Sequence, residues 1–226
     1  MKFKGLLAFT ALLATTFANA QQAQTYVDES GGMNYGYTKK APSEPAGGTQ
    51  YYIDSFNAAK IDDSNEITLV KYNAYSDEME LKIHDEVVVL EPKDGMMIRL
   101  VNNQANYTFT QYTNKDGIAS QNYLVVISDA SNLKIFKRER IYLQPEQHPQ
   151  GGYQKYKAPL YKKQNPEYYI QMNNGDIVYM SDRKKDVIKL IPGKEKEVKK
   201  FMKENRIKIS DDKDLQLLGN YMNTLL

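Results

Sequence analysis

The stretch EITLVKYNAYSDEMELKIHDEVVVLEP, residues 66–92, sets the fold class of this chain. It contains three short runs rich in β-branched and aromatic residues, EITLVKYNAY, EMELKI and EVVVLEP, and such runs are typical of β-strands. Only a few residues separate one run from the next. Connections this short join antiparallel neighbours, because a parallel crossover needs a dozen residues or more. We therefore expect an antiparallel sheet.

The same pattern continues to residue 180. Further runs of this kind are GMMIRLV, NYTFTQY, NYLVVIS, LKIFKRERIYLQ, EYYIQM and DIVYM. Turn chemistry separates many of them, with Asp-Gly at 94–95 and 116–117 and Asn-Gly at 174–175. These dipeptides supply the positive φ angles that tight hairpins need. We expect one antiparallel β domain over residues 51–181, built as a sandwich or a curved meander.

Helical periodicity replaces the strand pattern in residues 182–226. Apolar stripes recur at helical spacing in RKKDVIKLI and KEKEVKKFMKEN, and again in a last segment that Ser210 or Asp211 can cap. Three short amphipathic helices cannot bury their stripes alone. We therefore expect an α+β fold, in which a small C-terminal bundle of short helices packs on the β domain.

The N-terminus carries the signals of export. Residues 1–20, MKFKGLLAFTALLATTFANA, combine two lysines, an apolar run and an Ala-Asn-Ala cleavage site, which predicts a secretory signal peptide. Residues 21–50 are rich in Gln, Gly, Ser, Thr and Pro, which favours a disordered leader. We expect an exported, periplasmic protein; an extracellular location is the alternative, because both routes begin with this signal.

The chain contains no cysteine. Disulfides, thiolate metal sites, a cysteine nucleophile and a lipidated cysteine are therefore excluded. A mature chain of about 200 residues can bury an ordinary core as one domain. No later stretch is long and apolar enough to cross a bilayer, so we expect no membrane span.

Charge is balanced overall and concentrated locally. The chain has 30 Lys and Arg against 28 Asp and Glu, and the signal peptide removes Lys2 and Lys4. A protein that binds nucleic acid normally has a basic surface, so we expect no nucleic-acid partner. Between Asp182 and Lys208, however, the sequence contains 11 basic and 5 acidic residues. We interpret this run as the solvated side of a helix; docking on a partner protein is the first alternative, and binding to lipid or a polyanion the second. We expect no peripheral membrane contact, because a helix that lies on lipid needs a larger apolar face with bulky aromatics, and only Phe201 qualifies.

The segment 144–166, QPEQHPQGGYQKYKAPLYKKQNP, interrupts the strand pattern with four prolines and a Gly pair. Long loops of this kind are often functional. Tyrosine offers a large, rigid contact area with one polar tip, so tyrosines among lysines are typical of a binding surface. The alternative is that the tyrosines pack back on the sheet. The candidate partner-binding residues are Tyr153, Lys155, Tyr156, Lys157, Tyr161, Lys162 and Lys163.

Catalytic signatures are absent from the sequence. The two histidines, His84 and His148, do not form a His-x-x-x-His pair, and no Gly-x-Ser-x-Gly motif exists. We expect a protein that is not an enzyme, with no cofactor and no metal. A pair of carboxylates for glycoside hydrolysis stays open, because their spacing is spatial.

Two segments resemble a known family. YNAYSDEMEL at 72–81 and the ending KKDVIKLIPGKEKEVKKFMKENRIKISDDKDLQLLGNYMN at 184–223 are similar to a family of uncharacterised exported proteins of the Bacteroidota. The resemblance covers most of residues 66–226. It implies a cell-envelope setting and brings no catalytic residue.

These observations give two hypotheses about function. The first is a non-catalytic periplasmic binding or accessory protein that contacts a larger envelope assembly, such as an outer-membrane or secretion complex. The second is a glycan-binding or glycan-processing exported protein that uses tyrosines as stacking platforms, although the absence of Trp argues against it.

Overall fold

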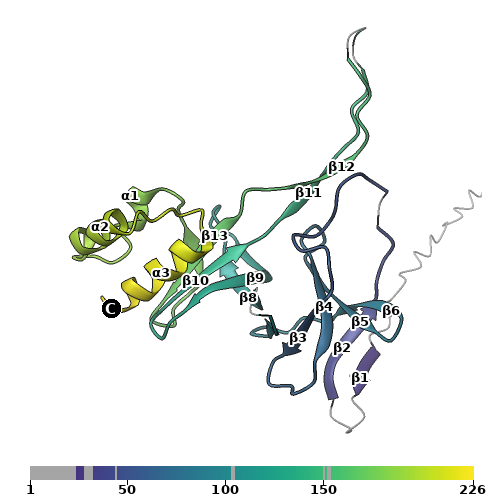
Figure 1. Ribbon diagram of the computed structural model, residues 1–226, viewed down its shortest axis with the longest axis horizontal. Coiled ribbons are helices and arrows are strands. Elements are labelled where there is room, and N and C mark those ends of the chain that lie inside the picture. The colour runs from purple at the N-terminus through teal and green to yellow at the C-terminus, as the bar shows by residue number, and fades with distance from the viewer. Residues whose placement is uncertain (1–23, 28–32, 44, 103–104, 150, 152–153) are drawn as a thin grey trace, which may run out of the picture.

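The chain folds into a sheet at one end and a small barrel with helices at the other, and a narrow two-stranded arm projects between them (Figure 1). The structure is a computed structural model that describes residues 24–27, 33–43, 45–102, 105–149, 151 and 154–226. The expected signal peptide, residues 1–20, lies outside the described residues. No helix in the described part of the chain is long and apolar enough to cross a bilayer.

The first half of the chain forms an antiparallel sheet in the order β1-β2-β6-β5-β4-β3-β7. Its strands are β1 (Gln24–Val27), β2 (Met33–Lys39), β3 (Asn57–Ile61), β4 (Thr68–Asn73), β5 (Glu78–Ile83), β6 (Glu86–Leu90) and β7 (Met97–Leu100). The three runs of residues 66–92 become β4, β5 and β6. They pair in sequence order, as short connections require.

The segment 21–50 departs from the disordered leader expected for it. Its described part contains β1 and β2, and β2 adds to the sheet beside β6, with Tyr37 opposite Leu90. The backbone N–H of Glu91 also donates to the carbonyl of Gly36 at 2.8 Å. Pairing with an existing strand supplies backbone hydrogen bonds that the polar composition of this segment does not reveal.

The second half contains a closed five-stranded barrel among the described residues, in place of a sandwich. Its strands are β8 (Asn106–Thr113), β9 (Ala119–Asp129), β10 (Leu133–Arg138), β13 (Glu167–Met172) and β14 (Val178–Met180). All pair antiparallel except β14 and β8, which close the ring in parallel at Val178 and Thr113. Because β7 pairs with β8, the first sheet runs directly into the barrel.

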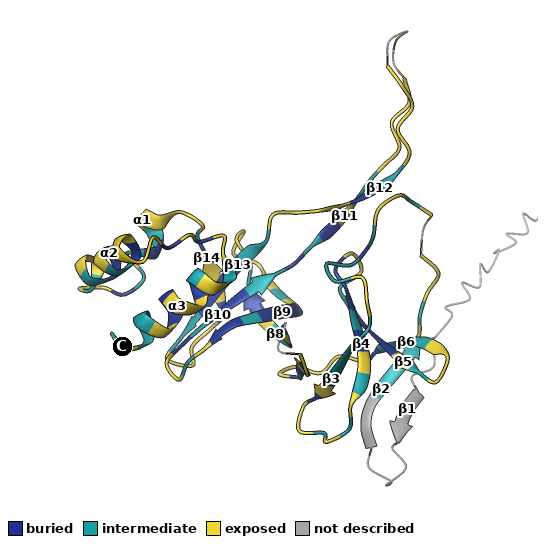
Figure 2. Cartoon of the chain, in the orientation of Figure 1, coloured by how far each residue is buried: buried dark blue, intermediate teal, exposed yellow. Residues whose placement is uncertain are grey.

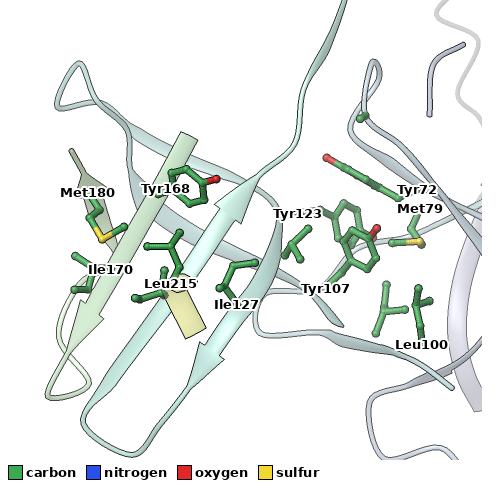
Figure 3. Close-up of a cluster of buried hydrophobic side chains, with 14 of the residues drawn as sticks. Tyr72, Met79, Leu100, Tyr107, Tyr123, Ile127, Tyr168, Ile170, Met180 and Leu215 are labelled. Atoms are coloured by element: carbon green, nitrogen blue, oxygen red, sulfur yellow. The ribbon is translucent and has the colours of Figure 1, made fainter. Parts of the chain in front are cut away.

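Two buried clusters follow from strand alternation. Inward-facing residues fill the barrel: Tyr112, Leu124, Phe136, Tyr169 and Ile177. Outward-facing residues of the same strands join the main core, which continues to β4 and β5 on one side and to the C-terminal helices on the other (Figure 3). Tyr123 of β9, for example, lies edge-on to Tyr72 of β4, with ring centroids 5.8 Å apart. One continuous core therefore connects the sheet, the barrel and the helices.

A polar contact joins the β4–β5 turn to the barrel. Asp77 has a positive φ of 60° in this turn, and its carboxylate accepts hydrogen bonds from the hydroxyl of Tyr72 and the side-chain amide of Asn122 on β9. Burial raises the pKa of Asp77, although these two hydrogen bonds act in the opposite direction. The turn is thereby fixed to the barrel by a partly desolvated carboxylate.

The C-terminal helices lie outside the barrel. They are α1 (Lys184–Val187), α2 (Glu195–Glu204) and α3 (Asp212–Asn223), and α3 lies against β9 and β10. Asp211 is the N-cap of α3 and accepts from the backbone N–H groups of Lys213 and Asp214. The expectation of an α+β fold with short C-terminal helices is confirmed.

Candidate functional site

The segment expected as a long loop forms a projecting β-ribbon. Strands β11 (Ile141–Gln144) and β12 (Leu160–Lys163) pair antiparallel, and a further bridge joins Gln147 to Lys157 farther out. Residues 141–163 are called the arm below. The arm extends away from the body of the protein, and most of its described residues beyond the strands are exposed (Figure 2). The run LKIFKRERIYLQ is therefore two strands, β10 in the barrel and β11 in the arm.

The base of the arm is attached to the first sheet by buried side chains. Tyr161 of β12 is only 8% exposed, and its hydroxyl accepts a hydrogen bond of 2.7 Å from the side-chain amide of Gln50. Its ring packs edge-on against Tyr75, with centroids 5.0 Å apart. On the other strand, the N–H of Ile141 donates to the carbonyl of Ala74 at 3.0 Å. These contacts fix the direction in which the arm leaves the body.

Two glycines complete this attachment through the backbone. The N–H of Gly47 donates to the carbonyl of Pro159 at 3.0 Å, and the N–H of Tyr161 donates to the carbonyl of Gly47 at 2.8 Å. The adjacent Gly48 has a φ of +79°, and a Cβ at this position would lie 2.7 Å from the carbonyl oxygen of Tyr161. Only glycine fits this conformation and this approach. Gly47 and Gly48 thus allow the backbone to pack closely against β12.

A buried polar network lies beneath the base. The amide of Asn73 donates to Gln50 at 2.9 Å and to Glu80 at 3.1 Å. Glu80 is 1% exposed and forms an ion pair of 2.7 Å with Lys40 and a hydrogen bond of 2.9 Å with Tyr51. Burial acts to lower the pKa of Lys40, but the hydrogen bonds and charge of Glu80 and Tyr51 raise it on balance. A charged network of this kind holds its members in fixed positions.

One face of the outer arm carries a polar cluster of three side chains. The hydroxyl of Tyr156 donates to the carboxylate of Glu146 at 2.8 Å, and a ring nitrogen of His148 lies 3.2 Å from the other carboxylate oxygen. The rings of His148 and Tyr156 are 5.5 Å apart. The hydrogen bonds from Tyr156 and His148 lower the pKa of Glu146. The hydrogen bond to the Glu146 carboxylate raises the pKa of Tyr156. The cluster stays accessible, because Tyr156 is 52% exposed.

The opposite face of the outer arm is basic. Side chains alternate along a strand, so Lys155 and Lys157 lie on the face away from Tyr156. Lys157 is the bridge partner of Gln147, and all three of these polar residues are exposed. A partner that contacts the arm would therefore meet a carboxylate, an imidazole and a phenol on one face and two ammonium groups on the other.

The seven candidate residues fall into three groups. Tyr153 lies outside the described residues. Tyr161 is buried in the base, so it positions the arm and does not form its surface. The exposed members are Lys155, Tyr156, Lys157, Lys162 and Lys163. Glu146 and His148 belong to the same exposed cluster but were not among the expected residues. Had the segment been interpreted as a hairpin, their spacing of two residues would have placed both on one face of a strand opposite Tyr156.

A second candidate site lies where the barrel interior reaches the surface. A cleft of about 220 Å³ is lined there by inward-facing residues that include Val126 and Phe136. A neighbouring cleft of about 330 Å³ shares three lining residues with it, Thr110, Gln171 and Ile177. Barrel mouths with an apolar floor and polar walls are common places for small ligands.

The two histidines lie in different settings. His84 occupies the turn between β5 and β6 with a positive φ of 53°, whereas His148 lies on the arm. Among the described residues, no group of three or more His, Cys, Asp or Glu side chains is arranged to hold a metal ion. Comparison of the chain with models of known protein families, with curated proteins and with solved structures found no match.

Proposed function

We propose that the chain is an exported, non-catalytic accessory protein of the cell envelope, located in the periplasm, and that its arm binds a protein of a larger envelope assembly. The observation that carries this proposal is the arm itself. Its base is fixed by buried contacts of Tyr161 and Gln50, while its outer part exposes Tyr156 and a set of lysines.

The energetics of a bare ribbon support a binding role. An isolated two-stranded hairpin is at best marginally stable in water, because it has no core of its own. The outer arm adds exposed surface without adding to the buried clusters of the body. A partner that covers the ribbon would bury the ring of Tyr156 and supply the missing contacts. The rigid base reduces the conformational entropy lost on binding.

The test is an affinity purification of the tagged mature protein from crosslinked cell envelopes, followed by mass spectrometry. The matched variant replaces residues 145–159 with Asn-Gly, which closes a two-residue hairpin between Gln144 and Leu160. This change removes the outer arm and leaves Tyr161 and its contact with Gln50 in place. The new glycine before Leu160 supplies a backbone carbonyl in place of that of Pro159, which accepts from the N–H of Gly47. We expect a membrane-complex partner with the full protein and its loss with the variant.

A point variant separates the arm surface from its backbone. Changing Lys155, Tyr156 and Lys157 to Ala removes the exposed side chains but keeps the ribbon, and changing Lys60, Lys82 and Lys93 to Ala is the control on the first sheet. The arm variant should lose the partner and the control should keep it. Recovery of the bait alone, or of the same partner with the shortened arm, would refute the proposal.

The alternative is a glycan-binding protein, and the cleft at the barrel mouth is the observation in its favour. Thr110 and Gln171, with a hydroxyl and an amide group, line this cleft together with the aromatic side chain of Phe136. A glycan array and a hydrolysis screen test this function. A signal that disappears in Gln171→Leu would support it, and the absence of any glycan-dependent signal would remove it.

A further inference from the structure

The exposed side of α2 carries a straight row of lysines. Lys196, Lys199, Lys200 and Lys203 follow one another at steps of three, one and three residues, which places all four on one face of a helix. All four are exposed. These residues are called the lysine stripe below.

The orientation of the stripe is fixed by the other side of the helix. Val198 and Met202 are buried in the main core, at 0% and 3% exposure. Phe201 stacks on Tyr221 of α3, with parallel rings 3.9 Å apart. The helix therefore cannot rotate to place these apolar side chains elsewhere, and the stripe points permanently to solvent.

Negative charge compensates the stripe only in part, because α2 also contains Glu195, Glu197 and Glu204. Lys200 lies 3.9 Å from Glu204, but within the described part of the chain Lys196, Lys199 and Lys203 form no ion pair. More exposed cations surround α2, and among the residues that the structure describes these also lack an ion pair: Lys184, Lys185, Lys189, Arg206 and Lys208. This end of the molecule therefore carries a local excess of positive charge on a chain that is otherwise balanced.

Some lysine pairs of the stripe are unfavourable for the helix, although Glu195, four residues before Lys199, and Glu204, four residues after Lys200, offset part of this repulsion. Lysines four residues apart, as in the pairs Lys196–Lys200 and Lys199–Lys203, repel one another on a helix surface. Lys196 also lies in the first turn, where the partial positive charge of the helix disfavours cations. A ligand that brings negative charge would relieve both effects.

We propose that the lysine stripe binds the phosphate groups of an anionic lipid surface, by adsorption and without insertion. Lysine is a compact, hydrated point charge, suited to mobile phosphates, whereas arginine is the usual choice for shaped, bidentate recognition. The stripe itself contains four lysines and no arginine. The burial of Val198 and Met202 rules out insertion of α2 into the lipid. The argument from sequence was directed against an inserting helix, so it does not apply to adsorption through the lysines.

The stripe and the arm can act at the same time. Figure 1 places α1 and α2 at the end of the molecule away from β1 and β2, and the arm leaves from the region between. Adsorption through α2 would leave the arm free. The inference goes beyond the proposed function, because lipid binding and partner binding use different residues and can fail independently.

The experiment measures binding of the full mature chain to vesicles by sedimentation. The vesicles contain phosphatidylcholine alone or phosphatidylcholine with phosphatidylglycerol. We expect binding only to the anionic vesicles, lost on raising the salt concentration. The variant K196Q/K199Q/K203Q should bind about 100-fold more weakly, because each lysine near such a surface contributes roughly a factor of five.

A control with the same change in charge separates the stripe from net charge. K60Q/K82Q/K93Q removes three exposed lysines from the first sheet and should bind like the unchanged protein. Circular dichroism verifies that both variants are folded. Equal binding to neutral and anionic vesicles, unchanged binding of the stripe variant, or no vesicle binding at all would each overturn the proposal. Binding to soluble polyphosphate but not to vesicles would overturn it as well and would assign the stripe to a soluble polyanion.

Discussion

Gln50 and Tyr161 are 111 residues apart in the chain, yet the amide of Gln50 donates a hydrogen bond of 2.7 Å to the hydroxyl of Tyr161. Both side chains are buried, and the contact joins the segment before β3 to the second strand of the arm. The position of the proposed binding arm therefore depends on a segment whose composition is typical of a flexible leader.

Replacing Tyr161 with Phe tests this contact. The ring can still pack against Tyr75, but a buried amide donor of Gln50 loses its acceptor. We expect a loss of about 1–2 kcal/mol in the free energy of unfolding, measured by urea titration. Tyr142→Phe, at an exposed position on the neighbouring strand, is the control and should change little. Equal effects of the two substitutions would show that the hydrogen bond does not stabilise the base.

Removing Lys40, the cation of the buried network, should lower the free energy of unfolding more than Tyr161→Phe does. In Lys40→Met, the carboxylate of Glu80 stays buried and keeps Tyr51 and Asn73 as donors but loses its ion-pair partner. We expect destabilisation of about 3 kcal/mol, seen as a lower denaturant midpoint. Lys82→Met, on the exposed side of β5, is the matched control. A stability equal to that of the control would contradict the assigned role of the ion pair.

The carboxylate of Asp77 should make stability depend on pH. Burial raises its pKa in the folded chain, so folding favours the protonated form. The stabilisation that Asp77 contributes to the free energy of unfolding is therefore complete at acidic pH. It is lost as the pH rises from about 4 through the raised pKa of Asp77. The free energy of unfolding, compared with that of Asp77→Asn, should decrease in this direction. The exposed Asp63→Asn variant should show no such trend, and an increase with pH would refute the assignment.

Gly219 should not tolerate alanine, although alanine favours helices. In the middle of α3, a Cβ at this position would lie 2.7 Å from Oγ and 2.9 Å from Cβ of Ser128 on β9. The helix would have to move away from the barrel, at a cost of about 1–3 kcal/mol that exceeds the gain in propensity. Gln216→Ala, on the exposed side of α3, should be neutral in the same thermal unfolding experiment.

The sequence predicted the elements that depend on local pattern. EMELKI and EYYIQM became β5 and β13 with the same bounds, and the last segment became a helix capped by Asp211. Such predictions succeed because the side-chain period and the turn residues are set by neighbours within a few positions.

Features that depend on distant pairing were not predicted. Closure of the barrel requires Thr113 and Val178 to meet in parallel, and no local pattern indicates such a partner. The run at 144–166 looked like a loop because prolines and glycines interrupt it, but pairing of Gln147 with Lys157 makes it a ribbon. Long-range pairing depends on which strand edges are available after the rest of the chain has folded.

For this protein, then, the sequence determined most of the strand and helix segments between residues 66 and 226, the absence of cysteine chemistry and the local excess of lysine near the C-terminus. Only the tertiary structure decided what those residues can reach. It buried Tyr161 and exposed Tyr156, two tyrosines of the same segment, and it fixed the lysine stripe outward by burying Val198 and Met202. The physical reason is that periodicity is a property of neighbouring residues, whereas burial depends on contacts between residues far apart in the chain.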